Sequence, residues 1–216
     1  AVPLGDAVAR GAAAAATPPE VMLVAAPMAP GALSYNDVIY GADGNDMVRA
    51  GLGHDVVFGG EGNDAIAGGP GVDFVEGGKG NDRIEGGNGV DVIFGGEGND
   101  SIGGGAGSDY LIGGAGNDII DAGTGDDWVF GDSTNSYPAG YTNPVRYAMD
   151  FAALNRGLDS IMAGDGNDIV VAGNANDRVS GGDGADLLVG GEGNDVLNGG
   201  DGTDLILGDW RLVSDD

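Results

Sequence analysis

The chain has 216 residues, 47 of them glycine, and its 35 acidic against 8 basic residues give a formal charge of -27. It contains no cysteine and one histidine, which excludes a disulfide scaffold and any metal site built from clustered thiolates and imidazoles. No nucleic-acid partner is expected, because the whole surface would repel a polyanion. With 41% hydrophobic residues, the chain still has enough apolar side chains to form a core.

Residues 1–33 form an Ala/Pro-rich segment, which we expect to dock on the rest of the molecule or on a partner. Its most apolar stretch, residues 21–32, is short and broken by two prolines, so we predict no transmembrane segment. A strand-only opening rung is expected at residues 34–40, before the regular pattern begins.

A nine-residue repeat dominates residues 34–132. Ten consecutive nonapeptides, such as GGEGNDAIA, run from 41 to 130, and five more run from 163 to 207. The sixth place is always Asp and the eighth is always Val, Ile or Leu. The second and fourth places are Gly, except at Ala42 and Ala175.

Each place in the repeat has a physical reason. Glycines at the second and fourth places permit positive φ, so six residues can make a tight turn. The three remaining residues form a strand whose eighth place points inward while the seventh and ninth point outward. We therefore predict an all-β fold in which each nonapeptide is half a coil, eighteen residues complete a rung, and the strands form two parallel sheets.

The repeat is interrupted by a Tyr- and Pro-rich insertion loop at residues 133–158. Of two interpretations, a recognition loop and a surface excursion that plugs the roll, we favour the surface excursion. The second block, 159–207, resumes in phase if residues 131–158 replace one ordinary turn, so it should continue the same solenoid. Residues 208–216 are expected to cap the end.

The pattern G-G-x-G-x-D-x-U-x, where U is aliphatic, resembles the RTX family of secreted bacterial proteins, the hemolysin-type calcium-binding nonapeptide repeat. The repeats cover about two thirds of the chain. The resemblance implies a right-handed parallel β-roll with Ca²⁺ held between stacked turns by sixth-place Asp side chains and turn carbonyls. It also implies type I secretion, although the residues after the last repeat are fewer than the family's C-terminal signal needs, so we expect a fragment or another export route.

The sixth-place aspartates should form two files, one along each edge of the roll. Strands about 4.8 Å apart would make each file a ladder of like charges that repels itself open without cations. All-oxygen ligands on carbonyl-rich turns suit Ca²⁺ better than Mg²⁺. In the alternative interpretation these aspartates are ordinary turn formers. Neighbouring pairs within each block give about eleven sites, and eleven divalent ions would reduce the charge from -27 to about -5.

The candidate metal ligands are Asp46, Asp55, Asp64, Asp73, Asp82, Asp91, Asp100, Asp109, Asp118, Asp127, Asp159, Asp168, Asp177, Asp186, Asp195 and Asp204. Two further candidates, Asp132 and Asp209, each follow a glycine at the end of a block, where an aspartate replaces the second-place glycine.

The outward places differ between the two predicted sheets. On one sheet fifteen of sixteen are apolar, with Glu76 as the exception, whereas on the other they are small, polar or charged. Eight rungs make an apolar strip roughly 40 Å long, which exceeds what a soluble monomer usually exposes. We expect it to be covered by residues 1–33, by the insertion, by a second copy in a homodimer, or by a neighbouring domain or protein. The candidate interface residues are Phe58, Phe74, Phe94, Tyr110, Trp128 and Phe130.

No catalytic motif is apparent. There is no G-x-S-x-G sequence, His54 has no catalytic companions, and carboxylates that bind metal would be unavailable for acid–base chemistry. We therefore expect no enzyme activity but an extracellular calcium-binding structural or interaction module that folds on Ca²⁺ binding, as in an adhesin, a surface layer or an assembly component. The alternative is the non-catalytic calcium-binding module of an RTX enzyme (a protease, lipase or epimerase) or of a toxin.

Overall fold

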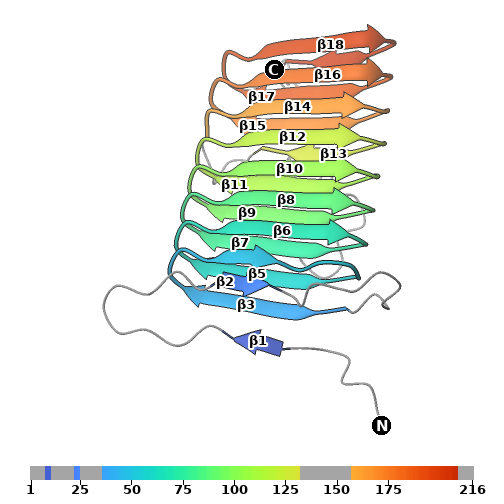
Figure 1. Cartoon of the computed structure of the whole chain (residues 1–216). Helices are drawn as coiled ribbons and strands as arrows, with labels where there is room; N and C mark the ends of the chain where they lie inside the picture. Colours follow the sequence, from blue (N-terminus) through green and yellow to red (C-terminus); the bar gives the residue numbers. More distant parts are fainter. Residues whose placement is uncertain (1–7, 11–21, 25–35, 132–156, 209–216) are drawn as a thin grey trace, which may run out of the picture.

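The chain folds into a stack of β-rungs, seen in a computed structural model that describes residues 8–10, 22–24, 36–131 and 157–208. These residues form nineteen strands and no helix, which confirms the all-β prediction (Figure 1). The strands alternate between two sheets, so the chain coils once for every two strands. The described residues accordingly include no helix long and apolar enough to span a membrane.

Both sheets are parallel throughout, and we name them A and B. Sheet A contains, in spatial order, β1 (Val8–Arg10), β3 (Val38–Asp43), β5 (Val56–Glu61), β7 (Phe74–Lys79), β9 (Val92–Glu97), β11 (Tyr110–Ala115), β13 (Trp128–Phe130), β15 (Ile169–Asn174), β17 (Leu187–Glu192) and β19 (Leu205–Leu207). Sheet B contains β2 (Met22–Val24), β4 (Met47–Arg49), β6 (Ala65–Pro70), β8 (Arg83–Asn88), β10 (Ser101–Ala106), β12 (Ile119–Thr124), β14 (Ser160–Asp165), β16 (Arg178–Gly184) and β18 (Val196–Gly202).

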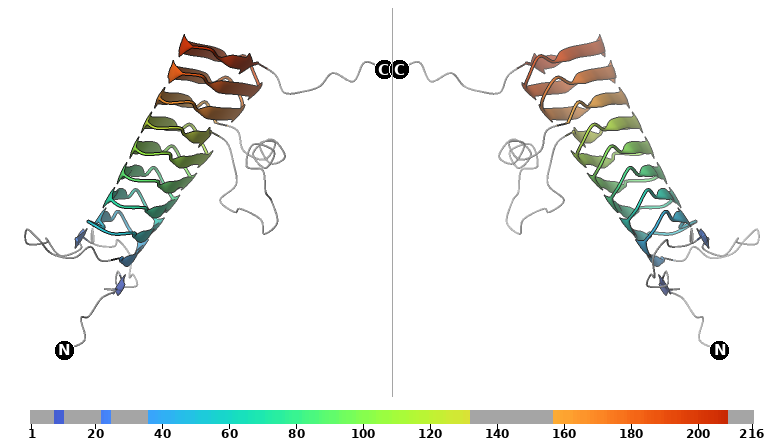
Figure 2. Two further views of the ribbon diagram at one scale, coloured as in Figure 1. Left: turned by 90° about the vertical axis from the view of Figure 1, so that its right-hand side faces the viewer. Right: turned by 90° about the vertical axis from the view of Figure 1, so that its left-hand side faces the viewer.

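Within each block of repeats, paired residues on neighbouring strands of a sheet are eighteen residues apart, as two nonapeptides per rung require. Ile66 pairs with Ile84 in sheet B, and Val57 pairs with Val75 in sheet A. Seen from the side, the rungs stack in one continuous column (Figure 2). The fold is therefore the parallel β-roll predicted from the repeat.

The core between the two sheets consists mainly of eighth-place side chains. Val57, Val75 and Ile84 are fully buried, and they belong to one continuous hydrophobic cluster that runs along the roll from β3 to β17. Strand side chains alternate in direction, so each strand sends its eighth-place residue inward, and the next inward place, the first of the following nonapeptide, holds Gly or Ala. Each rung thus contributes two aliphatic side chains to a narrow core, and the turns must hold the sheets close together.

The turn glycines make this close approach possible. Gly60, at a second place, has φ +118°, and a Cβ there would lie only 1.9 Å from the carbonyl oxygen of Ala42 in the preceding turn. Among the described residues only Ala42 (φ 84°) and Ala175 (φ 105°) adopt positive φ without being glycine. The two exceptions to the glycine pattern therefore keep the glycine conformation, at a cost in backbone strain.

The roll continues across the insertion without a change of register. Val129 pairs with Val170, and the backbone N–H of Leu158 donates to Asn117 Oδ1, as fifth-place residues of neighbouring turns do elsewhere. A Cβ at Gly157 would meet the carbonyl oxygen of Gly116, which places Gly157 at the fourth place of its turn. Gly131 occupies the first place, since its backbone N–H and C=O make the usual first-place bonds. Residues 132–156 therefore stand where an ordinary turn has only its second and third residues.

The two ends of the roll are built differently. At the N-terminal end, β1 pairs with β3 and β2 pairs with β4, so each sheet gains one strand that lies outside the nonapeptide pattern. At the C-terminal end, Leu205, Ile206 and Leu207 of β19 are all exposed. The remainder of the N-terminal segment, the insertion and the predicted cap after Gly208 lie outside the described residues.

Candidate metal sites

The sixth-place aspartates stack in two files, as the repeat predicts. We name the edge where the chain passes from sheet A to sheet B edge AB, and the opposite edge BA. Edge AB carries Asp46, Asp64, Asp82, Asp100, Asp118, Asp159, Asp177 and Asp195, and edge BA carries Asp37, Asp55, Asp73, Asp91, Asp109, Asp127, Asp168, Asp186 and Asp204. Every file lies just before the strands of one sheet, so strand pairing sets its spacing.

One carboxylate oxygen of each stacked aspartate is used to join two rungs. The backbone N–H of Asp64 donates to Asp82 Oδ1 at 2.8 Å, and the backbone N–H of Asp82 donates to Asp100 Oδ1 at 2.8 Å. The same bond recurs along both files at 2.7–3.2 Å. Each carboxylate thus reaches back to the turn that precedes its own on the same edge.

In eleven of the stacked aspartates the second carboxylate oxygen is left without a hydrogen-bond partner. All the aspartates of both files are 8% exposed or less, except Asp195 and Asp204 in the final turns. The Oδ2 atom is buried and makes no hydrogen bond in Asp55, Asp64, Asp73, Asp82, Asp91, Asp100, Asp109, Asp127, Asp168, Asp177 and Asp186. A buried anionic oxygen costs several kcal/mol unless it is paired with a cation or coordinates a metal ion. These oxygens therefore mark where a cation would be held.

Backbone carbonyls supply further oxygen atoms beside the carboxylates. A Cβ at Gly59 would lie 2.4 Å from Asp64 Oδ2 and 2.4 Å from the carbonyl oxygen of Gly77, so both oxygens border the space at this glycine. The fourth-place carbonyl of Gly44 likewise points along the stack toward Gly62. First-place and fourth-place glycines thus leave room for oxygen atoms that any side chain would displace.

This donor set fits Ca²⁺. Within the part of the chain that the structure describes, no three Asp, Glu, His or Cys side chains gather at one point, so a cation must take part of its shell from carbonyls. Calcium accepts six to eight oxygen ligands, including carboxylates, backbone carbonyls and water, in flexible geometry, whereas magnesium demands a small octahedron. Two stacked carboxylates with neighbouring turn carbonyls match the calcium preference.

Without a cation, the same burial makes these carboxylates hard to ionise. Burial raises the pKa of Asp82 to about 6 and that of Asp100 to about 7. The neighbouring carboxylate raises each pKa further, whereas the hydrogen bond from the backbone N–H of the preceding aspartate lowers it. The pKa is also raised to about 6, with burial as the main cause, in Asp64, Asp73, Asp91, Asp109, Asp127, Asp168 and Asp177. A file of such groups binds protons near pH 6, and at neutral pH, where the groups ionise, it favours a bound cation.

The structure places sixteen of the eighteen candidate ligands in the two files, and their role as ligands stays a prediction. Asp132 and Asp209 lie outside the described residues. Asp37 also lies in a file but was not predicted as a ligand, although the sequence Asn-Asp-Val-Ile-Tyr at 36–40 matches the second half of the repeat.

The stacking gives fifteen neighbouring pairs instead of the eleven counted within blocks. The four additional pairs are Asp37–Asp55, Asp118–Asp159, Asp127–Asp168 and Asp159–Asp177. Three of them arise because the roll continues through the insertion and begins one half-rung earlier, and the fourth, Asp159–Asp177, lies within the second block and was left out of the eleven. The number of ions stays a prediction.

The candidate interface residues all point outward from sheet A, but their exposure differs. Phe58, Phe74, Tyr110 and Trp128 are partly exposed, as expected for an outer face. Phe94 and Phe130 are buried, although their places in the repeat point away from the core. These two side chains are therefore not available to a partner on an open strip. No homodimer or docking partner is shown.

A family model described as the RTX calcium-binding nonapeptide repeat (4 copies) matches residues 32–66, 67–102, 103–137, 155–188 and 180–210. Together these matches cover nearly the whole roll. No curated protein matches the chain.

Proposed function

Because the chain belongs to the family with RTX calcium-binding nonapeptide repeats, we propose that it is an extracellular module whose β-roll forms when Ca²⁺ binds between its stacked turns. The observation that carries this proposal is the two files of buried carboxylates, in eleven of which the Oδ2 atom makes no hydrogen bond. RTX nonapeptide repeats bind calcium, and they are typical of secreted bacterial proteins.

The residues of each turn would have separate tasks in holding an ion. The sixth-place carboxylates, such as those of Asp82 and Asp100, would supply negative oxygens through Oδ2 while Oδ1 fixes the neighbouring backbone N–H. The glycines direct carbonyl oxygens along the stack, and the eighth-place side chains exclude water behind the turns. Bound calcium supplies the positive charge that makes the buried carboxylates tolerable. Metal binding and rung stacking then become one event, so the binding free energy contributes to folding.

The charge of the chain supports a role outside the cell. A formal charge of -27 opposes any compact state until cations neutralise it. Cytosolic calcium is too scarce to do so, whereas external calcium suffices for weak oxygen sites. The chain would therefore cross the membrane unfolded, through a type I channel as its family resemblance implies, and fold afterwards.

The role we propose is structural and not catalytic. A carboxylate such as that of Asp82 would be committed through Oδ1 to a backbone N–H and through Oδ2 to the metal, which leaves neither oxygen to transfer a proton. The apolar outer face of sheet A, with its stacked Tyr40 and Phe58 rings, supports use as an adhesin, surface-layer or assembly component.

Circular dichroism with metal titration tests the proposal. The purified chain is held in EDTA at neutral pH and titrated with CaCl₂ or, in parallel, with MgCl₂ at matched ionic strength. Calcium should convert coil to β-structure cooperatively, EDTA should reverse the change, and magnesium should be much less effective. A chain that is equally ordered in EDTA, or that responds equally to both ions, would contradict the proposal.

A further inference from the structure

The fifth places of the repeat join neighbouring turns by a second set of hydrogen bonds. On edge AB the backbone N–H of Asn81 donates to Asn63 Oδ1 at 2.7 Å, and that of Asn99 donates to Asn81 Oδ1 at 2.7 Å. Equivalent bonds join eleven of the fifteen neighbouring pairs of turns, with Asn, His, Ser or Asp as the acceptor. Each fifth-place side chain reaches forward to the next turn, whereas the sixth-place carboxylates reach back. Such a pair of turns is therefore held by two side-chain bonds that run in opposite directions.

The second bond is missing in the middle of edge BA. Val72 and Val90 occupy consecutive fifth places there, and a valine side chain offers no acceptor to the backbone N–H of the next fifth place. Their side chains are 48% and 49% exposed, so burial does not replace the bond. Among the residues that the structure describes, the pairs Asp73–Asp91 and Asp91–Asp109 thus have the aspartate bond, 2.9 Å in each case, as their only side-chain hydrogen bond between turns.

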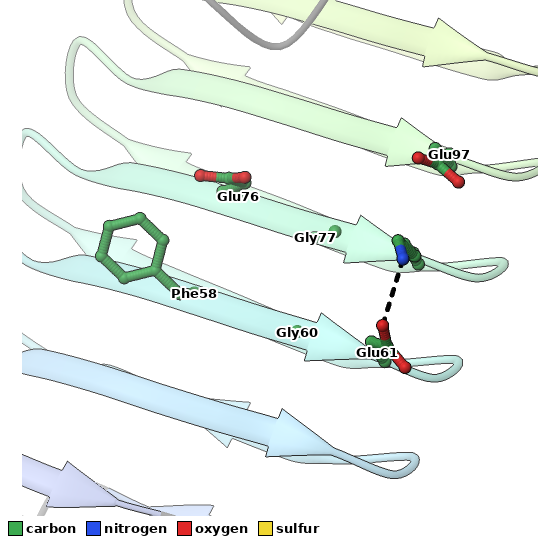
Figure 3. A pocket seen from close by; sticks show the side chains of 8 residues that line it. Phe58, Gly60, Glu61, Glu76, Gly77 and Glu97 are labelled. Carbon is green, nitrogen blue, oxygen red and sulfur yellow. Dashed lines mark hydrogen bonds and ion pairs between the residues drawn. The ribbon is translucent and has the colours of Figure 1, made fainter.

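Edge AB is joined more fully over the same rungs. Its fifth places from Asn45 to Asn117 are all asparagine, and each accepts a bond from the following turn. One pair of turns has a further link at the third place, since Figure 3 shows Glu61, at the end of β5, in an ion pair with Lys79 at 3.1 Å. The two side chains are more than half exposed, so this ion pair contributes little. The asparagines therefore account for most of the difference between the edges.

We propose that the fifth-place side chains position the stacked turns for calcium, so that the sites between Asp73, Asp91 and Asp109 fill last. This inference rests on the proposed function. A calcium ion shared by two turns must gather oxygen atoms from both into one shell. Where an asparagine already holds the turns together, less conformational freedom is lost when the ion binds, and the affinity is higher. Where the fifth place is valine, ion binding must itself order the turns.

The turns with the missing bonds lie beside the apolar groove of sheet A. The seventh-place residues that directly follow their aspartates are Phe74, Val92 and Tyr110, which together with Trp128 line an open groove of about 550 Å³. The last calcium ions to bind would therefore fix one wall of this groove. Its shape should respond to calcium at concentrations above those that fold the rest of the roll.

Amide hydrogen exchange, measured residue by residue by NMR on the full chain, tests the proposal. The backbone N–H groups of Asp73 and Asp91 are compared with those of Asp64 and Asp82. All four residues are buried to the same degree, and each N–H donates to the aspartate of the following turn. Exchange is measured at the lowest calcium concentration that completes the change in circular dichroism, and again at about tenfold more calcium.

Substitutions at the fifth places separate their effect from that of the surrounding sequence. The double substitution Val72→Asn/Val90→Asn supplies the two missing acceptors. Val196→Asn makes the same change on the outer face of sheet B, where the side chain is 56% exposed, and is the matched control. In the opposite direction, Asn81→Ala removes the acceptor of the Asn99 backbone N–H.

At the lower calcium concentration, the amides of Asp73 and Asp91 should exchange about fivefold faster than those of Asp64 and Asp82, because one hydrogen bond fewer opposes opening of the turns. Additional calcium should narrow this difference, since filled sites then hold the turns. The double substitution should abolish it, Val196→Asn should leave it unchanged, and Asn81→Ala should bring the exchange of Asp82 to the rate of Asp91.

The inference and the proposed function can fail separately. If calcium orders the chain but the four amides exchange equally, or the difference does not narrow with calcium, the fifth places do not determine the order of filling and the inference is overturned alone. A difference that survives the double substitution also overturns it. If calcium does not order the chain at all, the proposed function is wrong and the inference falls with it.

Discussion

The Asp82→Asn substitution should have opposite effects with and without calcium. The amide oxygen of Asn can still accept the hydrogen bond from the Asp64 backbone N–H, so the contact between rungs survives while one negative charge is removed. Without metal, the buried carboxyl of Asp82 has its pKa raised from 3.8 to about 6, so it is ionised at pH 8 at a cost to the folded state. The difference between these two pKa values corresponds to about 3 kcal/mol of destabilisation of the folded state, which solvent screening reduces to about 1–2 kcal/mol.

The metal-free effect is measured as the concentration of trimethylamine N-oxide that folds the chain in EDTA at pH 8, followed by circular dichroism. The Asn variant should fold at a lower osmolyte concentration, and the shift should correspond to about 1–2 kcal/mol in the free energy of folding. In the absence of osmolyte, the calcium concentration for half-folding should instead rise about tenfold, because an anionic ligand between two neighbouring turns is lost. Asp121→Asn, on the exposed face of β12, removes the same charge away from the turns and should change both midpoints little.

Two results would refute this reasoning. If Asp82→Asn destabilises the chain both with and without calcium, the carboxylate acts only through its hydrogen bond. If the substitution favours folding under both conditions, calcium does not use Asp82 as a ligand.

The remaining predictions concern pH and the turn backbone. Since burial raises the pKa of Asp82 to about 6 and that of Asp100 to about 7, the stability that these groups contribute to the metal-free roll should be complete below pH 4 and lost as pH rises through 6–7; equal circular dichroism in EDTA at pH 4 and pH 8 would contradict this. Gly78→Ala places a Cβ 2.1 Å from the Gly60 carbonyl oxygen at φ +117°, so it should lower thermal stability in calcium by about 3 kcal/mol or more. Gly103→Ala is the control: its Cβ meets only the Glu85 side chain, and it should lower stability by less than about 1 kcal/mol. Ala175→Gly should raise thermal stability by about 1 kcal/mol, because Ala175 already holds φ 105°, and no gain would mean that the strain is absorbed elsewhere.

Much of the roll could be predicted because the residues of one nonapeptide determine the structure of its own turn and strand. Glycine at the second and fourth places, Asp at the sixth and an aliphatic residue at the eighth each have a reason within a single turn and strand. Stacking then follows from repetition, so the core and the aspartate files were predictable without knowledge of distant contacts. Asp37 escaped because the first half of its turn does not follow the pattern.

The burial of Phe94 and Phe130 could not be predicted from the repeat. Their ninth places are equivalent to those of Phe58 and Glu76, which are partly exposed. The difference depends on what lies over each strand, and the repeat carries no information about that. Residues 132–156 do not follow the nonapeptide, so the repeat predicts nothing about them.

The aspartate hydrogen bonds give the stack a direction. These carboxylates reach back to the preceding turn on the same edge, eighteen residues earlier within the repeats and 41 across the insertion, so each turn is fastened by the one that comes after it. Rungs that contact only adjacent rungs behave as a one-dimensional zipper. In such a zipper, each newly added rung locks the previous one in place.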